Sequence, residues 1–189
     1  MRRLETIEVC HILLNDPQFI SMLLLIDRDL AEQRRSHGCP CGGVLHRADY
    51  PRKPRGCPPE ARADCNSRFS FCCNQCRKRV TVESVRFMGR RVYLSLAVVL
   101  LSRRRAGPTA AQVQVAEALA VPVRTVARWR HWWAQVFPAT PLWQAYCARF
   151  MPPVEAADLP CALIARFTGT AVESMRRLLA FLSPLSVPQ

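Results

Sequence analysis

The chain has 189 residues, room for one ordinary domain or two small ones, and half of them are hydrophobic, which excludes wholesale disorder. The formal net charge is +13, and Lys53 and Lys78 are the only lysines among the 27 basic residues. This charge favours a polyanionic partner, although a GC-rich genome also raises the arginine content.

The sequence also bears on cellular location. No stretch of about 18 consecutive apolar residues is present, so we expect no membrane partner. The first ten residues lack the regions of a signal peptide. We therefore expect a cytoplasmic protein whose ten cysteines stay reduced, a setting in which clustered cysteines favour a metal over disulfides.

Residues 1–36 are interpreted as an N-terminal helical segment. The apolar spacing predicts a helix from Pro17 to Arg35 with Asp16 as its cap. Asp27 and Asp29 are expected on its outer face, and the helix is expected to serve packing or dimerisation. Its inward-facing residues are predicted to be Phe19, Met22, Leu23, Ile26 and Leu30.

Residues 37–88 form a second segment, rich in proline and glycine, with a strand predicted over 80–87. Zinc requires four soft or borderline ligands in a tetrahedron, and two tight turns with paired thiolates supply them. Gly42 and Gly43 allow the first turn to adopt positive φ. The predicted zinc ligands are Cys39, Cys41, Cys73 and Cys76, with Cys72, Cys57, Cys65, His37 and His46 as alternatives.

These cysteine pairs resemble the zinc ribbon found at the front of bacterial insertion-sequence transposases and in many nucleic-acid-binding proteins. The first pair is CxC where ribbons usually carry CxxC, and the spacing between the pairs is longer than usual. The resemblance implies one zinc ion in a small β module.

The positive charge is concentrated in the middle of the chain. Residues 47–105 contain fifteen basic and four acidic residues, a balance of +11. A proline-stiffened loop at 46–56 presents several cations in extended form, a shape that can follow a phosphate backbone or cover the ribbon as a solvated loop. The predicted phosphate contacts are Arg52, Lys53, Arg55, Arg77, Lys78 and Arg79.

Residues 89–150 form a predicted helical unit. A helix with basic ends is expected over 90–105, and residues 109–135 resemble a helix-turn-helix motif. Thr109 and Gln112 are expected to form a capping box. Ala120 stands where the turn usually has glycine, and Pro122 where a Ser or Thr cap is usual.

The second helix of this motif is predicted to read double-stranded DNA. Its inward face would carry Val126, Trp129 and Trp133. The opposite face would enter the major groove. There, Arg124, Thr125, Arg128 and His131 are expected to face bases and Arg130 a phosphate.

Residues 151–189 form a C-terminal helical tail, whose apolar patch at 178–182 is interpreted either as core or as an oligomerisation surface. Glu155, Asp158 and Glu173 fall on short helices without strands, so no catalytic transposase domain is predicted. Together these features predict a mainly α protein with a small β zinc-ribbon-like module.

The predicted function is that of a non-catalytic DNA-binding protein, either a transposase-like recognition module or a mobile-element accessory or regulatory protein. Its possible protein partners are a second copy of the chain or a transposase. Two alternatives remain open: an RNA-binding zinc-ribbon protein, and a protein-interaction adaptor whose charge reflects codon usage.

Overall fold

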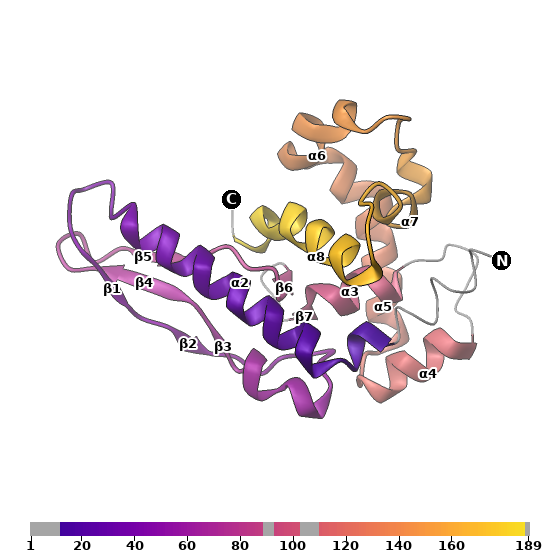
Figure 1. The fold of residues 1–189 in the computed structure, drawn as a ribbon, viewed down its shortest axis with the longest axis horizontal. Helices are drawn as coiled ribbons and strands as arrows, with labels where there is room; N and C mark the ends of the chain where they lie inside the picture. The colour runs from indigo at the N-terminus through magenta and orange to yellow at the C-terminus, as the bar shows by residue number, and fades with distance from the viewer. Residues whose placement is uncertain (1–11, 89–92, 103–109, 188–189) are drawn as a thin grey trace.

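The fold is mainly helical with small antiparallel sheets, of which the three-stranded one lies at one end (Figure 1). It is taken from a computed structural model that describes residues 12–88, 93–102 and 110–187. The expected capping box at Thr109 lies outside these residues. Within them, no helix is long and apolar enough to cross a membrane.

Helix α2 (Pro17–Ser36) is the longest described helix and matches its predicted bounds. Oδ1 of Asp16 caps it by accepting from the backbone N–H of Gln18 at 2.9 Å and of Phe19 at 3.3 Å. The expected outward position of Asp27 is wrong, because this side chain is buried, whereas Asp29 is exposed.

Three short strands form the main sheet. Strands β1 (Leu45–Arg47), β4 (Ser70–Cys73) and β5 (Arg79–Thr81) pair antiparallel in the order β1-β4-β5. Leu45 lies opposite Cys73, which brings the two cysteine-bearing turns to the same end of the sheet. Between β1 and β4, the chain forms a second antiparallel pair of strands, β2 (Tyr50–Pro51) and β3 (Ser67–Arg68). Two 3-10 turns, Pro59–Ala61 and Ala63–Cys65, lie between these two strands.

The strand predicted over 80–87 is interrupted. Strand β5 ends at Thr81, and pairing resumes only at β6 (Phe87–Met88), which pairs with β7 (Tyr93–Leu94). Between them the backbone turns to bind Asp27: the Val85 N–H donates to Oδ1 at 2.7 Å. A tertiary contact therefore overrides the local alternation.

The helix predicted over 90–105 is shorter where the structure describes it, since Tyr93 and Leu94 are in strand β7. Helix α3 (Ser95–Leu101) follows, and all its side chains are buried. Helices α4 (Ala110–Ala118) and α5 (Val123–His131) come next, and a π-helical turn (Trp132–Val136) extends α5. The remaining elements are Phe137–Ala139, α6 (Pro141–Tyr146), Cys147–Arg149, Ala156–Asp158, α7 (Cys161–Ile164), α8 (Ala171–Leu182) and Ser183–Ser186.

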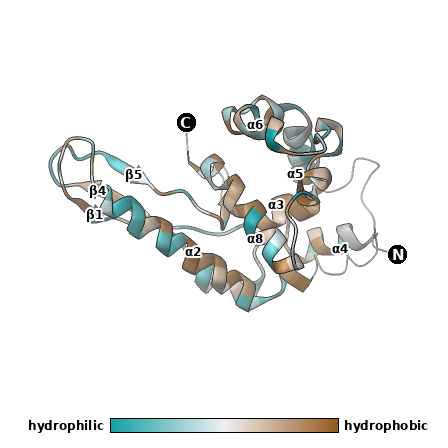
Figure 2. Cartoon of the chain, turned by 45° about the horizontal axis from the view of Figure 1, so that its top comes forward, coloured by the Kyte–Doolittle hydropathy of each residue, from teal (hydrophilic) through white to brown (hydrophobic). Residues whose placement is uncertain are grey.

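One main hydrophobic core takes side chains from all four predicted segments, and a smaller core lies under the β1-β4-β5 sheet. Leu178 and Leu179 of α8 are 0% and 1% exposed within the main core. The apolar patch at 178–182 is thus mostly core, with Phe181 half-buried. Figure 2 shows hydrophobic residues on α3 and the N-terminal half of α2, while the C-terminal half of α2 is more hydrophilic.

Candidate metal centre and nucleic-acid interface

Four cysteines gather at the end of the sheet. The Sγ atoms of Cys39, Cys41, Cys73 and Cys76 all lie within 4.8 Å of one another. The Sγ of Cys41 is 3.5 Å from that of Cys39 and 3.5 Å from that of Cys73, and Cys39 and Cys76 are 3.6 Å apart. Tetrahedral zinc with Zn–S bonds of about 2.3 Å implies sulfur–sulfur spacings of about 3.8 Å. The donor set and its dimensions therefore fit a metal ion.

The first turn is closed by backbone hydrogen bonds. The Gly42 N–H donates to the carbonyl of Cys39 at 2.9 Å, and the Cys39 N–H donates to the carbonyl of Gly43 at 3.3 Å. Gly42 has φ +82°, a conformation that side chains disfavour. A Cβ on Gly43 would lie 2.5 Å from Sγ of Cys73, so glycine permits the two turns to approach.

The second turn is closed in a similar way. The Cys73 N–H donates to the carbonyl of Lys78 at 3.1 Å, and Arg77 adopts φ +58°. Asn74 ties this turn to the first one: its N–H donates to the Val44 carbonyl at 3.0 Å, and its Oδ1 accepts from the Val44 N–H at 2.9 Å. Asn74 is not among the residues predicted from the sequence. The feature that could have identified it is an asparagine side chain directly after the predicted ligand Cys73.

The surroundings of the cluster give Cys39 and Cys41 different pKa values. A hydrogen bond from the Gly43 backbone N–H and the interactions with the neighbouring sulfurs lower the pKa of Cys41 to about 6. For Cys39, the Cys41 backbone N–H lowers the pKa, but desolvation and the neighbouring sulfurs outweigh it and raise the pKa to about 12. The free cluster therefore holds thiolate and thiol side by side, an arrangement suited to a cation that replaces protons.

The alternative ligands do not join the cluster. Cys72 lies on the opposite face of β4, where its Sγ donates to the Arg77 carbonyl at 3.6 Å. Cys57 and Cys65 are buried elsewhere and hydrogen-bond to each other, which lowers the pKa of Cys57. His37 and His46 are also outside the group of sulfurs that the structure brings together.

Arg77, Lys78 and Arg79 follow the second cysteine turn in the chain and are exposed. Arg79 donates to the carbonyl of Ala48 at 2.9 Å, and its guanidinium lies 5.5 Å from the ring centroid of Tyr50. Three cations thus accompany a cluster that carries negative charge once its thiols ionise.

The basic loop packs against the sheet. The Arg52 guanidinium lies 4.4 Å from the Tyr50 ring centroid and donates to its hydroxyl at 3.1 Å. Burial raises the pKa of Tyr50, but hydrogen bonds and the nearby arginine charges outweigh it and lower the pKa. Arg52 is half-buried, whereas Lys53 and Arg55 are exposed.

The turn between α4 and α5 lies at the position predicted from the sequence. Ala120 has φ +50°, and the N–H of Val121 donates to the carbonyl of Ala116 at 2.7 Å. On α5, Val126 is 6% exposed, and Trp133 in the following turn is fully buried. The predicted inward face is confirmed for these two residues.

The opposite face of α5 exposes Arg124, Arg128 and His131. Thr125 differs from the prediction: its side chain is only 2% exposed, and its Oγ1 accepts a hydrogen bond from Arg128 at 3.1 Å. It therefore orients Arg128 and does not itself face outward. Arg130 is half-buried, and desolvation lowers its pKa.

The predicted cations occupy two places. The β4–β5 turn with Arg77 and Lys78 lies at one end of the molecule, and α5 lies toward the other (Figure 1). Arg55 is the loop cation that the structure brings close to α5, since it lines the same cavity as Arg124 and Arg128. The nucleic-acid candidates thus form two separate basic surfaces.

No family model, curated protein or solved structure matches the chain. Among the residues that the structure describes, the four cysteines are the one group of three or more potential metal ligands. Glu155, Asp158 and Glu173 are not gathered into a second one.

Proposed function

We propose that the chain is a non-catalytic, zinc-containing protein that binds double-stranded DNA. Its two cysteine turns would act as a zinc ribbon, and α4 and α5 as a helix-turn-helix whose second helix enters the major groove. Such a protein resembles the DNA-recognition part of insertion-sequence transposases, and would serve as a recognition module, accessory protein or regulator.

This proposal rests on the contrast between the buried face and the exposed, basic face of helix α5. One side packs Val126 into the core, while Arg124 and Arg128 stay exposed on the other. Guanidinium groups bind guanine edges through two parallel hydrogen bonds, and the N-terminal residues of a recognition helix are those that reach base edges. The net charge of +13 supplies the attraction to a phosphate backbone.

Zinc is the proposed ion because four cysteine sulfurs close its coordination shell. A shell made only of protein ligands is typical of structural zinc, which contributes folding energy and leaves no position for substrate. Zinc would lock the turns at 39–43 and 73–78 together. Elemental analysis of protein purified without added metal is expected to find one zinc per chain, and iron or no metal would contradict this identity.

DNA binding is tested by selecting duplexes from a random pool at about 150 mM salt and measuring affinity for a selected and a shuffled duplex. The variant Arg124→Gln with Arg128→Gln should lose discrimination worth about 1–3 kcal/mol for each base contact. Arg176→Gln, an exposed arginine on α8, is the matched control and should behave as wild type.

Three results would contradict the proposal. Selective binding that survives the Arg124 and Arg128 changes would remove α5 as the reading helix. Stronger retention of structured or single-stranded RNA than of duplex DNA would favour the RNA-binding alternative. Binding that vanishes at moderate salt would indicate charge attraction alone.

A further inference from the structure

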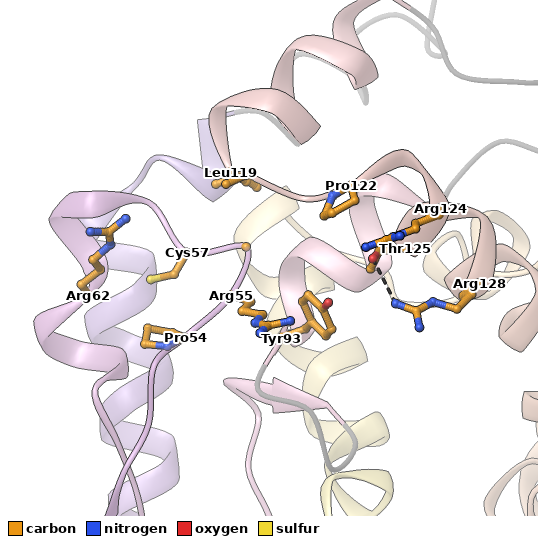
Figure 3. A pocket seen from close by; sticks show the side chains of 12 residues that line it. Pro54, Arg55, Cys57, Arg62, Tyr93, Leu119, Pro122, Arg124, Thr125 and Arg128 are labelled. Carbon is orange, nitrogen blue, oxygen red and sulfur yellow. Dashed lines mark hydrogen bonds between the residues drawn. The ribbon is translucent and has the colours of Figure 1, made fainter.

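A cavity of about 660 Å³ lies where the basic loop meets the turn between α4 and α5 (Figure 3). Its walls come from the segment after β2, from strand β7 and from the beginning of α5. A volume of this size is typical of sites for small molecules. The arginines that line it are Arg55, Arg62, Arg124 and Arg128.

The charged side chains that line this cavity are all positive. Its lining contains four arginines and no aspartate or glutamate. Like charges repel, and a concave wall focuses their field, so the cavity attracts an anion with more than one negative charge. Guanidinium groups favour phosphate because their planar N–H pairs match its oxygens.

The wall between the arginines is rigid and polar. Tyr93 is 6% exposed, and its ring packs edge-on against Trp129 with centroids 4.9 Å apart. Burial raises the pKa of Tyr93, but hydrogen bonds with Arg55 and Thr125 and the charges of Arg55 and Arg128 outweigh it and lower the pKa. The tyrosine hydroxyl thus connects the loop arginine to helix α5.

The backbone around the cavity is also fixed. The Leu94 N–H donates to the carbonyl of Arg55 at 3.2 Å, which attaches the loop to β7. Gly56 has φ +67°, and a Cβ there would meet Ala97 at 3.2 Å and Val121 at 3.4 Å. The loop is therefore seated against both α3 and the turn before α5, and little ordering is needed to bind a ligand.

We propose that this cavity is a phosphate-binding site, which takes a phosphate group carrying at least two negative charges or two neighbouring phosphates. The group comes either from a nucleic-acid backbone or from a free phosphorylated small molecule. The inference goes beyond base reading by α5, because it assigns a binding role to Arg62 and a positioning role to Tyr93, which that reading does not use.

Calorimetric titration of the full-length protein with inorganic pyrophosphate, at constant ionic strength and without DNA, tests the proposal. We expect saturable binding, weakened on the order of tenfold by Arg62→Gln and further by Arg55→Gln with Arg62→Gln, because each loses a charged hydrogen-bond donor. Arg62 is exposed, so its replacement should leave the fold intact. Arg176→Gln on α8 is the matched control, and zinc content is measured before and after titration.

A second arm distinguishes the two sources. If pyrophosphate displaces a bound duplex in proportion to the fraction of cavities that it occupies, the cavity holds a phosphate of the nucleic-acid backbone. If the protein binds pyrophosphate and the duplex at the same time, the cavity holds a free phosphorylated molecule. Absence of pyrophosphate binding, or equal binding by the Arg62→Gln and Arg176→Gln variants, would overturn the proposal. Because no DNA is present in the first arm, its failure is separate from a failure of DNA recognition.

Discussion

Nε of Arg86 lies 2.6 Å from Oδ2 of Asp27, and both side chains are 1% exposed. Oδ2 of Asp27 also accepts from the Ser84 hydroxyl at 2.6 Å. Arg86 further donates to the backbone carbonyls of Asp64 and Ser67. The pair thus connects helix α2, the segment before β6 and the 3-10 region in one fully hydrogen-bonded network.

Breaking this pair should destabilise the protein strongly. Asp27→Ala leaves a buried guanidinium without its counter-charge, and we expect the free energy of unfolding to fall by about 3–5 kcal/mol. Urea denaturation measures the change. The matched control is Asp29→Ala, an exposed aspartate on the same helix, which should stay within about 0.5 kcal/mol of wild type. Equal effects of both variants would show that the network does not hold these segments together.

Adjacent cysteines should differ in their importance for metal binding. Cys73→Ser removes a sulfur from the cluster, whereas Cys72→Ser removes a sulfur on the other face of the same strand. Elemental analysis is expected to show metal lost from the first variant and retained by the second. Loss of metal from both would place Cys72 among the ligands.

The close approach of the two turns predicts an effect of Gly43→Ala. The added methyl group would meet Sγ of Cys73 at 2.5 Å, so one turn must move away and metal should transfer faster to a chelator. Gly38→Ala is the control: a Cβ there would meet nothing within 4 Å, so its cost is only the strain of a side chain at φ +66°. Similar transfer rates for the two variants would argue against the packing described for Gly43.

Metal affinity should rise with pH. Cys39, with its pKa raised to about 12, keeps a proton at neutral pH that the metal must replace. Cys41, with its pKa lowered to about 6, is already a thiolate there and releases a proton only in more acidic solution. Chelator competition across about pH 5 to 8 should therefore show affinity falling more steeply below pH 6, and a constant slope would contradict these ionisation states.

The cations beside the metal centre are expected to act without sequence preference. Replacing Arg77 and Lys78 by glutamine should weaken binding to selected and shuffled duplexes equally, and lower the slope of log affinity against log salt by about two. Anisotropy titrations over a series of salt concentrations measure both effects. A loss confined to the selected duplex would mean that this end of the molecule reads bases.

The sequence by itself determined the elements whose signals are local. The bounds of α2 follow from its apolar spacing and the Asp16 cap, and the four-cysteine cluster follows from two tight turns. The inward position of Val126 follows from helical periodicity. The helix bounds and the position of Val126 depend on residues within a few positions of one another, where backbone geometry alone sets direction. The cysteine pairs are local too, but their meeting across more than thirty positions needed the β1–β4 pairing.

Tertiary structure alone decided which polar residues are buried and which distant residues meet. Asp27 is buried because its partner Arg86, 59 positions away, folds against it, and periodicity cannot identify such a partner. Thr125 is buried and hydrogen-bonds to Tyr93 of strand β7, a residue distant in sequence. The cavity joins Arg62 to α5 because the loop at Gly56 packs on the turn before that helix. Local sequence determines which residues share one face of a helix or strand. The free energy of burying a charge depends instead on which residues the rest of the chain places opposite it.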